Sequence, residues 1–113
     1  MKVTSEQSGG VSIVRVSETR LMYPMLADFS ATVAGLVAEG RRQILIDLAP
    51  VTYVDSATIG CLMDLYRQVS SAGGHLKLSG VQKRVETMLT LTGAHNFIEI
   101  HSDEPTAVKS FGA

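Results

Sequence analysis

The sequence predicts an α/β fold, with a mixed β-sheet of about five strands flanked by about four helices. Short β-branched stretches alternate with longer segments whose apolar residues recur every three or four positions. Gly or Pro lies at most of the changes from one pattern to the other. Strands that alternate with helices favour a largely parallel sheet with helices packed against it.

The first elements are predicted to be a hairpin and a helix. Residues 2–7 and 11–17 are expected to pair as antiparallel strands, because Gly9-Gly10 lies between two β-prone runs. Pro24 suits a first helical turn, and a helix is predicted from there to Gly40. Its apolar stripe consists of Leu26, Phe29, Val33, Leu36 and Val37.

A central strand and a second helix are predicted next. Residues 43–48 are apolar at consecutive positions, as in a strand covered on both faces. Either Asp55 or Ser56 can cap the helix that follows, and this helix is predicted to end at Gly73-Gly74. Its apolar positions are Ile59, Leu62, Met63, Tyr66 and Val69.

The last third of the chain predicts two more strands and two more helices. Residues 75–78 alternate as a strand, and Ser79 with Gln82 is expected to form a capping box for a helix that stops at Gly93. Residues 97–100 predict a short strand. A last short helix is expected to open at Ser102–Pro105 and to run through Phe111.

Length and composition indicate one globular domain over residues 1–113. Ten Lys and Arg against eleven Asp and Glu leave a net charge of -1, so neither nucleic acid nor a membrane surface is an expected partner. Residues 1–10 hold no apolar run, so no secretory signal is expected. The single cysteine, Cys61, cannot pair within the chain and favours a cytoplasmic location.

The densest cluster of small polar groups is Asp55-Ser56-Ala57-Thr58, between the central strand and the second helix. In open α/β sheets, function gathers at the carboxyl ends of strands. A phosphate on Ser56 or Thr58 would be favoured by the helix dipole. Plain helix capping needs the same residue types, so the cluster by itself leaves both interpretations open.

A family resemblance favours the functional interpretation. Residues 46–80, IDLAPVTYVDSATIGCLMDLYRQVSSAGGHLKLSG, resemble the signature region of the STAS family, and residues 81–111 resemble its closing helix, strand and helix. The resemblance covers roughly residues 11–111, and within the STAS family it is to the anti-sigma factor antagonist branch. It implies a STAS fold, no catalysis and no cofactor or metal. It also implies partner switching: the unmodified domain binds a serine kinase that restrains a sigma factor, and phosphorylation by that kinase ends the docking.

The family motif, Asp-Ser-Ser-Gly-Leu-Gly, is only partly matched. The usual phosphoacceptor is the second Ser, and here that position is Ala57, which has no hydroxyl. Thr58 or Ser56 could accept phosphate instead, and Thr58 is favoured because Ser56 is expected to cap the helix while Thr58 projects to solvent. The resemblance places the partner-binding surface on Asp55, Ser56, Ala57, Thr58, Ile59 and Gly60.

A second departure lies before the first helix. The family often carries an Asp that contacts the kinase, and this chain has Met22. Arg20, Met22 and Tyr23 are expected to form a partly apolar docking edge beside the 55–60 loop. The alternative is that Met22 and Tyr23 plug the core at the helix entry.

Other functions are weighed against docking. A STAS scaffold that is never phosphorylated is the main alternative, and Met63 and Tyr66 could mediate a homodimer. A small enzyme or nucleotide-binding domain is the distant one, since no phosphate-binding loop is present and Cys61 is expected to belong to the core. The three histidines match no metal-site spacing.

Overall fold

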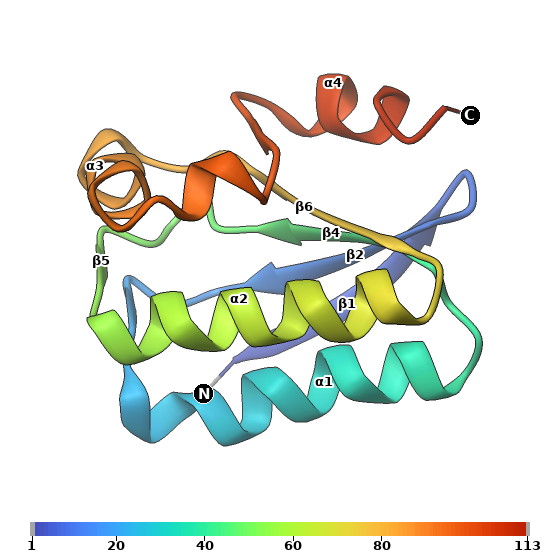
Figure 1. Ribbon diagram of the computed structural model, residues 1–113, viewed down its shortest axis with the longest axis horizontal. Helices are drawn as coiled ribbons and strands as arrows, with labels where there is room; N and C mark the ends of the chain where they lie inside the picture. The colour runs from blue at the N-terminus through green and yellow to red at the C-terminus, as the bar shows by residue number, and fades with distance from the viewer. Residues whose placement is uncertain (1, 113) are drawn as a thin grey trace.

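Residues 2–112 are described by a computed structural model (Figure 1). Five strands form one mixed sheet in the order β1-β2-β4-β6-β7, with β1 antiparallel to β2 and all the other neighbours parallel. The α/β prediction is therefore confirmed. The strands are β1 (Val3–Ser8), β2 (Val11–Val16), β4 (Gln43–Asp47), β6 (His75–Ser79) and β7 (Ile100–His101).

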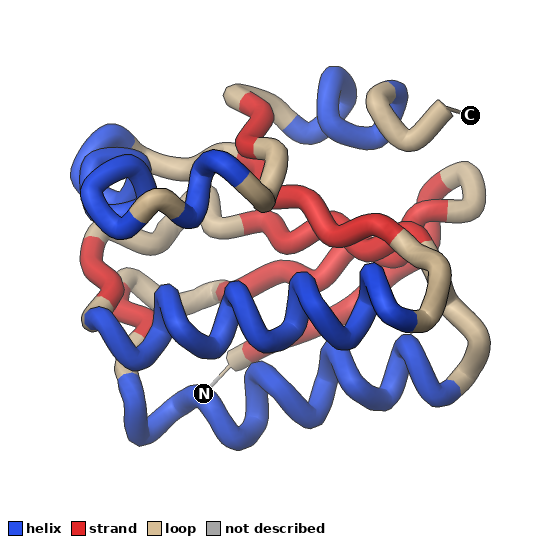
Figure 2. The backbone as a smooth tube through the Cα atoms, in the orientation of Figure 1, coloured by secondary structure: helices blue, strands red, loops and turns tan. Residues whose placement is uncertain are grey.

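Helices cover both faces of this sheet (Figures 1 and 2). Helices α1 (Leu26–Ala38) and α2 (Ser56–Ser71) lie along one face, and the short α4 (Glu104–Lys109) lies on the other. In β4, Ile44 and Ile46 belong to the main core, whereas Leu45 packs with the α4 side. The consecutive apolar residues of this strand are thus explained by cover on both of its faces.

The predicted hairpin is confirmed. Val3 pairs with Val16 at one end and Ser8 with Val11 at the other, which leaves Gly9 and Gly10 as a two-residue turn. Both glycines have positive φ, 55° and 85°. Two successive residues with positive φ match the twist of the strands on either side, and glycine adopts that backbone at no steric cost.

The predicted helices are present, with some ends formed differently. Pro24 lies in a 3-10 turn, Tyr23–Met25, that leads directly into α1. Helix α3 (Lys83–Thr92) stops at Gly93, whose φ is 81°, as expected. The capping box is wrong, because Ser79 is the buried last residue of β6 and the Gln82 side chain donates to the Ala49 carbonyl.

The predicted strand at 97–100 is shifted toward the carboxyl terminus. After Gly93 the chain continues as a second 3-10 turn, Ala94–Asn96, so Phe97 ends a turn and is exposed. Strand β7 therefore begins at Ile100 and pairs with β6 through Leu78. Asp103 caps the last helix, α4, by accepting from the Thr106 amide.

Two very short strands, β3 (Arg20–Leu21) and β5 (Tyr53–Val54), form a second sheet that was not predicted. They pair in parallel, Arg20 with Tyr53 and Leu21 with Val54. Each spans only two residues, so neither shows the alternation that reveals a longer strand. Of the helices that the structure describes, none is long and apolar enough to cross a membrane.

Candidate functional site

The β3–β5 ladder brings the segment before α1 against the segment before α2. The Thr52 amide and hydroxyl both donate to the Thr19 carbonyl, at 2.7 and 3.0 Å. The Arg20 guanidinium lies 5.0 Å from the centre of the Tyr53 ring, a cation–π contact. Residues about thirty positions apart in the sequence are thereby placed side by side.

Asp55 joins these two segments and caps α2. Its Oδ1 accepts from the Thr58 amide at 2.9 Å and lies 2.6 Å from the Thr58 hydroxyl. Its Oδ2 accepts from the Tyr23 amide at 2.9 Å. The same carboxylate therefore satisfies an open amide at the start of α2 and fastens the entry to α1.

The hydrogen bonds to Asp55 also favour its charged form. Desolvation raises its pKa, but the donors at Thr58 and Tyr23 outweigh that contribution. The net effect is a pKa below the ordinary value for aspartate. Asp55 is consequently an anion at neutral pH, and its charge is already matched by hydrogen-bond donors of its own chain.

Thr58 is part of this junction and is completely buried. Its hydroxyl lies 2.7 Å from the Leu21 carbonyl and 2.6 Å from Asp55 Oδ1, so its single proton is offered to two acceptors. The expectation that Thr58 projects to solvent is wrong. The expectation that Ser56 serves as the cap is also wrong, because a carboxylate at Asp55 reaches the same amide.

The remaining motif residues divide into exposed and buried positions. Ser56, Ala57 and Gly60 are exposed, while Ile59 packs into the main core at 4% exposure. The expected docking role of Thr58 and Ile59 therefore does not fit their position. Among residues 2–112, the Ser56 hydroxyl makes no hydrogen bond. It is the accessible hydroxyl on this turn.

Ala57 lies in an open groove between the first turns of α1 and α2. The groove is mostly apolar, with the Ser30 hydroxyl at one side. Tyr23 lines it and is 64% exposed, so most of its aromatic side chain is open to a partner. We call this surface the Ala57 groove; it is lined by Tyr23, Pro24, Leu26, Ala27, Ser30 and Ala57.

The residues expected to form a docking edge are brought beside this groove, but they differ in exposure. Tyr23 lines the groove, Arg20 is exposed and stacks on Tyr53, and Met22 is half-buried. Tyr23 is not the core plug that was considered as the alternative. The signal that could have revealed the groove is Pro24, which fixes the chain direction at the entry to α1.

Cys61 lies one turn beyond Ala57 on α2 and packs partly against the core. Burial raises the pKa of its thiol, and a contact with the Ser30 hydroxyl at 3.0 Å only partly opposes that shift. A thiol with a raised pKa is a poor nucleophile at neutral pH. Within residues 2–112, no group of three His, Cys, Asp or Glu side chains is placed to hold a metal ion.

Solved structures share this arrangement of elements. An anti-sigma factor antagonist from Mycobacterium paratuberculosis has a TM-score of 0.88 over 99% of this chain and 94% of that one, at 19% identity. The anti-sigma factor antagonist SpoIIAA in its unphosphorylated form has a TM-score of 0.72 over 96% of each chain, at 14% identity. These define the class: a mixed-sheet α/β module with the fold of anti-sigma factor antagonists.

Sequence comparison identifies the family. The chain belongs to the STAS domain family, whose model matches residues 2–107. It is similar to the anti-sigma-B factor antagonist of Bacillus subtilis, with 29% identity over 73 residues, 65% of this chain and 67% of that protein. It is also similar to an anti-sigma factor antagonist TM1081 homolog of Thermotoga neapolitana, with 32% identity over 63 residues. That match spans a little over half, 56%, of each of the two chains.

Proposed function

We propose that this chain is an anti-sigma factor antagonist that docks onto a kinase-type anti-sigma factor through the Ala57 groove and catalyses no reaction itself. The observation that carries the proposal is the position of Ala57, exposed on the first turn of α2 and lining an apolar groove. The family resemblance puts the phosphoacceptor at this position. The free thiol of Cys61 is compatible with the cytoplasm, where such a partner would act.

The groove has the character of a docking surface. It combines an exposed aromatic side chain, Tyr23, with small neighbours that leave room for an inserted partner side chain. Aromatic residues are enriched at the energetic centres of protein interfaces. The Asp55 and Thr58 hydrogen bonds hold the two walls together, so little ordering is needed when a partner binds.

Control by phosphate differs from the usual family pattern in this proposal. Ala57 has no hydroxyl, and the Thr58 hydroxyl is reached only after two hydrogen bonds open in the core. Ser56 is the remaining candidate, because it is exposed next to the groove. A phosphate there would add about two negative charges beside Asp55 and would weaken an apolar interface by desolvation and repulsion.

The alternative within the same family is a scaffold or homo-oligomeric component that is never phosphorylated. Two observations favour it as the second candidate. The acceptor position holds Ala57, and the Thr58 hydroxyl is buried. In that case docking is constitutive, and its strength does not depend on ATP.

Docking is tested by titrating the chain with the anti-sigma factor kinases of its own genome, using calorimetry. Ala57→Trp fills the groove at an exposed position and is expected to weaken binding at least about tenfold. Ala38→Trp is the matched control, because Ala38 is exposed at the far end of α1. Binding that is unchanged by Ala57→Trp, or weakened equally by both variants, would contradict the groove as the docking site.

The switch is tested by adding ATP and mapping phosphate by mass spectrometry. Ala57→Ser is expected to acquire phosphate at position 57 and then to release the kinase. Wild type is expected to carry phosphate at Ser56 or nowhere, and Ser56→Ala separates these two cases. If Ala57→Ser binds no kinase and gains no phosphate, the kinase partner is excluded and the scaffold alternative stands.

A further inference from the structure

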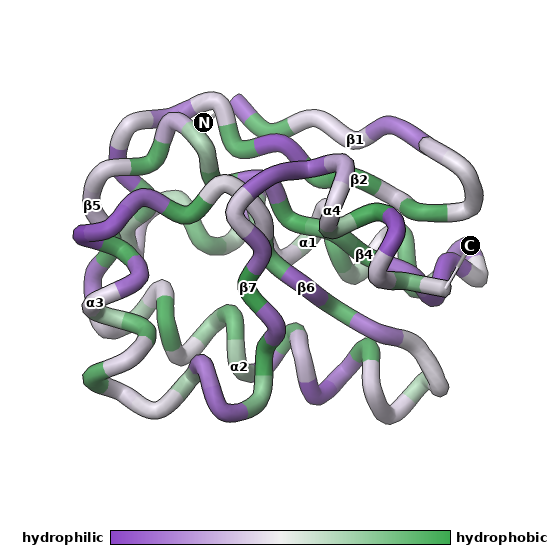
Figure 3. The backbone as a smooth tube through the Cα atoms, turned by 90° about the horizontal axis from the view of Figure 1, so that it is seen from above, coloured by the Kyte–Doolittle hydropathy of each residue, from purple (hydrophilic) through white to green (hydrophobic). Residues whose placement is uncertain are grey.

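Helix α4 covers the sheet face that lies away from the Ala57 groove, and it forms a small core of its own there. Figures 1 and 3 show it lying across the sheet on the side opposite α1 and α2. Ala107 and Phe111 pack on Val11, Ile13 and Leu45, separately from the main core. With six residues, α4 is too short to be stable unless it is docked.

Arg15 fastens the first turn of α4 to the sheet. Its Nη1 donates to Glu104 Oε1 at 2.6 Å and its Nη2 to Glu104 Oε2 at 3.1 Å, a bidentate pair. The same guanidinium also pairs with Asp47 on β4, at 2.8 Å, and with Glu6 on β1. These hydrogen bonds raise the pKa of Arg15, and the one that it donates to Glu104 contributes most.

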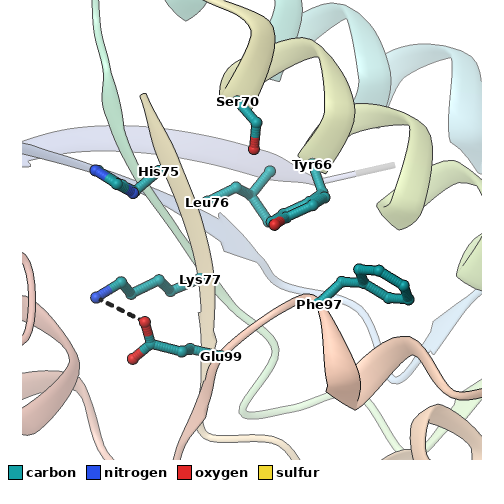
Figure 4. Close-up of a pocket in the computed structure, with 7 residues that line it drawn as sticks. All are labelled: Tyr66, Ser70, His75, Leu76, Lys77, Phe97 and Glu99. Carbon is teal, nitrogen blue, oxygen red and sulfur yellow. Dashed lines mark ion pairs between the residues drawn. The ribbon is translucent and has the colours of Figure 1, made fainter. Parts of the chain in front are cut away.

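Lys77 fastens the other end of α4. Its Nζ donates to the Ser110 carbonyl and hydroxyl, each at 2.9 Å, and lies 4.6 Å from the centre of the Phe111 ring. It also pairs with Glu99 at 3.3 Å, as Figure 4 shows. Gln43 adds a hydrogen bond from its Nε2 to the Phe111 carbonyl at 3.2 Å.

Both cations keep a carboxylate partner outside α4. If α4 lifts away, Arg15 still has Asp47 and Glu6, and Lys77 still has Glu99. Opening therefore leaves neither cation without a carboxylate partner. An unpaired charge is the usual reason why separating an ion pair is costly. What opening does expose is the apolar surface of Val11, Ile13 and Leu45.

We propose that α4 is a lid that lifts from the sheet as one unit while the rest of the domain stays folded. Ser102 is the hinge. On one side of it, the His101 carbonyl accepts from the Gly80 amide; on the other, Asp103 caps the helix. A hollow lies beside this hinge; it is lined by Gly80, Val81, Gln82, Glu86, Ile100, His101, Ser102 and Thr106.

The lid is tested by the rate at which a thiol reagent labels the Ala107→Cys variant. Ala107 lies on the face of α4 that packs against the sheet and is fully buried, so labelling there requires opening. Adding Glu104→Gln is expected to speed this labelling about tenfold, equivalent to about 1.4 kcal/mol. Raising NaCl from about 0.05 M to about 1 M is expected to speed it as well, because salt screens the ion pairs. Cys61, in the same chain, is the internal reference and should keep its rate.

Asp64→Asn is the matched charge control, because it removes an exposed pair with Arg67 on α2. A labelling rate at position 107 that neither Glu104→Gln nor salt changes would overturn the lid. An increase in labelling rate that Cys61 shows to the same extent would overturn it as well. Hydrogen exchange of residues 104–112 in the unlabelled full chain, followed by mass spectrometry, gives a second measurement. It should show the same salt dependence without a substitution at Ala107.

Discussion

Removing the hydroxyl of Thr58 should destabilise the domain more than removing its methyl group. Thr58→Val keeps the shape and the β-branching, so it leaves no cavity and little change in helix propensity. It does leave the Leu21 carbonyl without its buried donor, at a cost of about 1–3 kcal/mol. It also removes one of the donors to Asp55. The expected total is a loss of about 2–3 kcal/mol in the free energy of unfolding.

Thr58→Ser provides the comparison, because it keeps the hydroxyl and removes one buried methyl group. That methyl group is worth about 1 kcal/mol. Both variants are measured by urea unfolding, where an unchanged slope with denaturant shows that only stability has altered. Greater loss in Thr58→Ser than in Thr58→Val would refute the reasoning, since that order is the one expected of a residue that acts by packing alone.

Two other predictions concern pH and glycine. The depressed pKa of Asp55 means that its contribution to stability is present above its unfolded pKa and is lost as pH falls through the lower folded value. The difference in unfolding free energy between wild type and Asp55→Asn should therefore be constant near neutral pH and shrink below about pH 4. A Cβ at Gly74 would clash with the Arg42 carbonyl oxygen, so Gly74→Ala should cost about 2–3 kcal/mol. Gly35→Ala, in the open middle of α1, should instead gain about 0.5–1 kcal/mol, and equal effects of the two in urea unfolding would contradict the clash.

The sequence contained enough information to predict the main sheet and its helices. Periodicity identified them because their apolar residues repeat over many positions, as in α2 from Ile59 to Val69. The β3–β5 pair was not predicted, because strands of two residues are too short to show an alternating pattern. The shift of the strand after Gly93 was not predicted, because it depends on local hydrogen bonds. The amides of the β-prone residues Phe97 and Ile98 donate to the Ala94 carbonyl and so belong to the end of a 3-10 turn.

The structure places the predicted site residues Asp55, Ser56 and Thr58 together at the start of α2, but Ser56 and Thr58 make different contacts from those expected. Asp55, Ser56 and Thr58 can each cap a helix or accept a proton, and spacing alone does not say which does so. Their roles are set by two groups from the segment before α1: the Leu21 carbonyl, which accepts from the Thr58 hydroxyl, and the Tyr23 amide, which donates to Asp55. The β3–β5 pairing brings both groups to the start of α2. The missed information was therefore a contact between segments about thirty residues apart.

The same pairing means that the Ala57 groove cannot be carried by a short linear peptide. A synthetic segment covering α2 alone would contain Ala57 and lack the wall formed by Tyr23 and Pro24. The two walls meet only after the chain between them has folded into α1 and β4. Any protein that binds the groove thus recognises the completed domain. A partly folded or proteolysed copy would lack the groove and would not be bound.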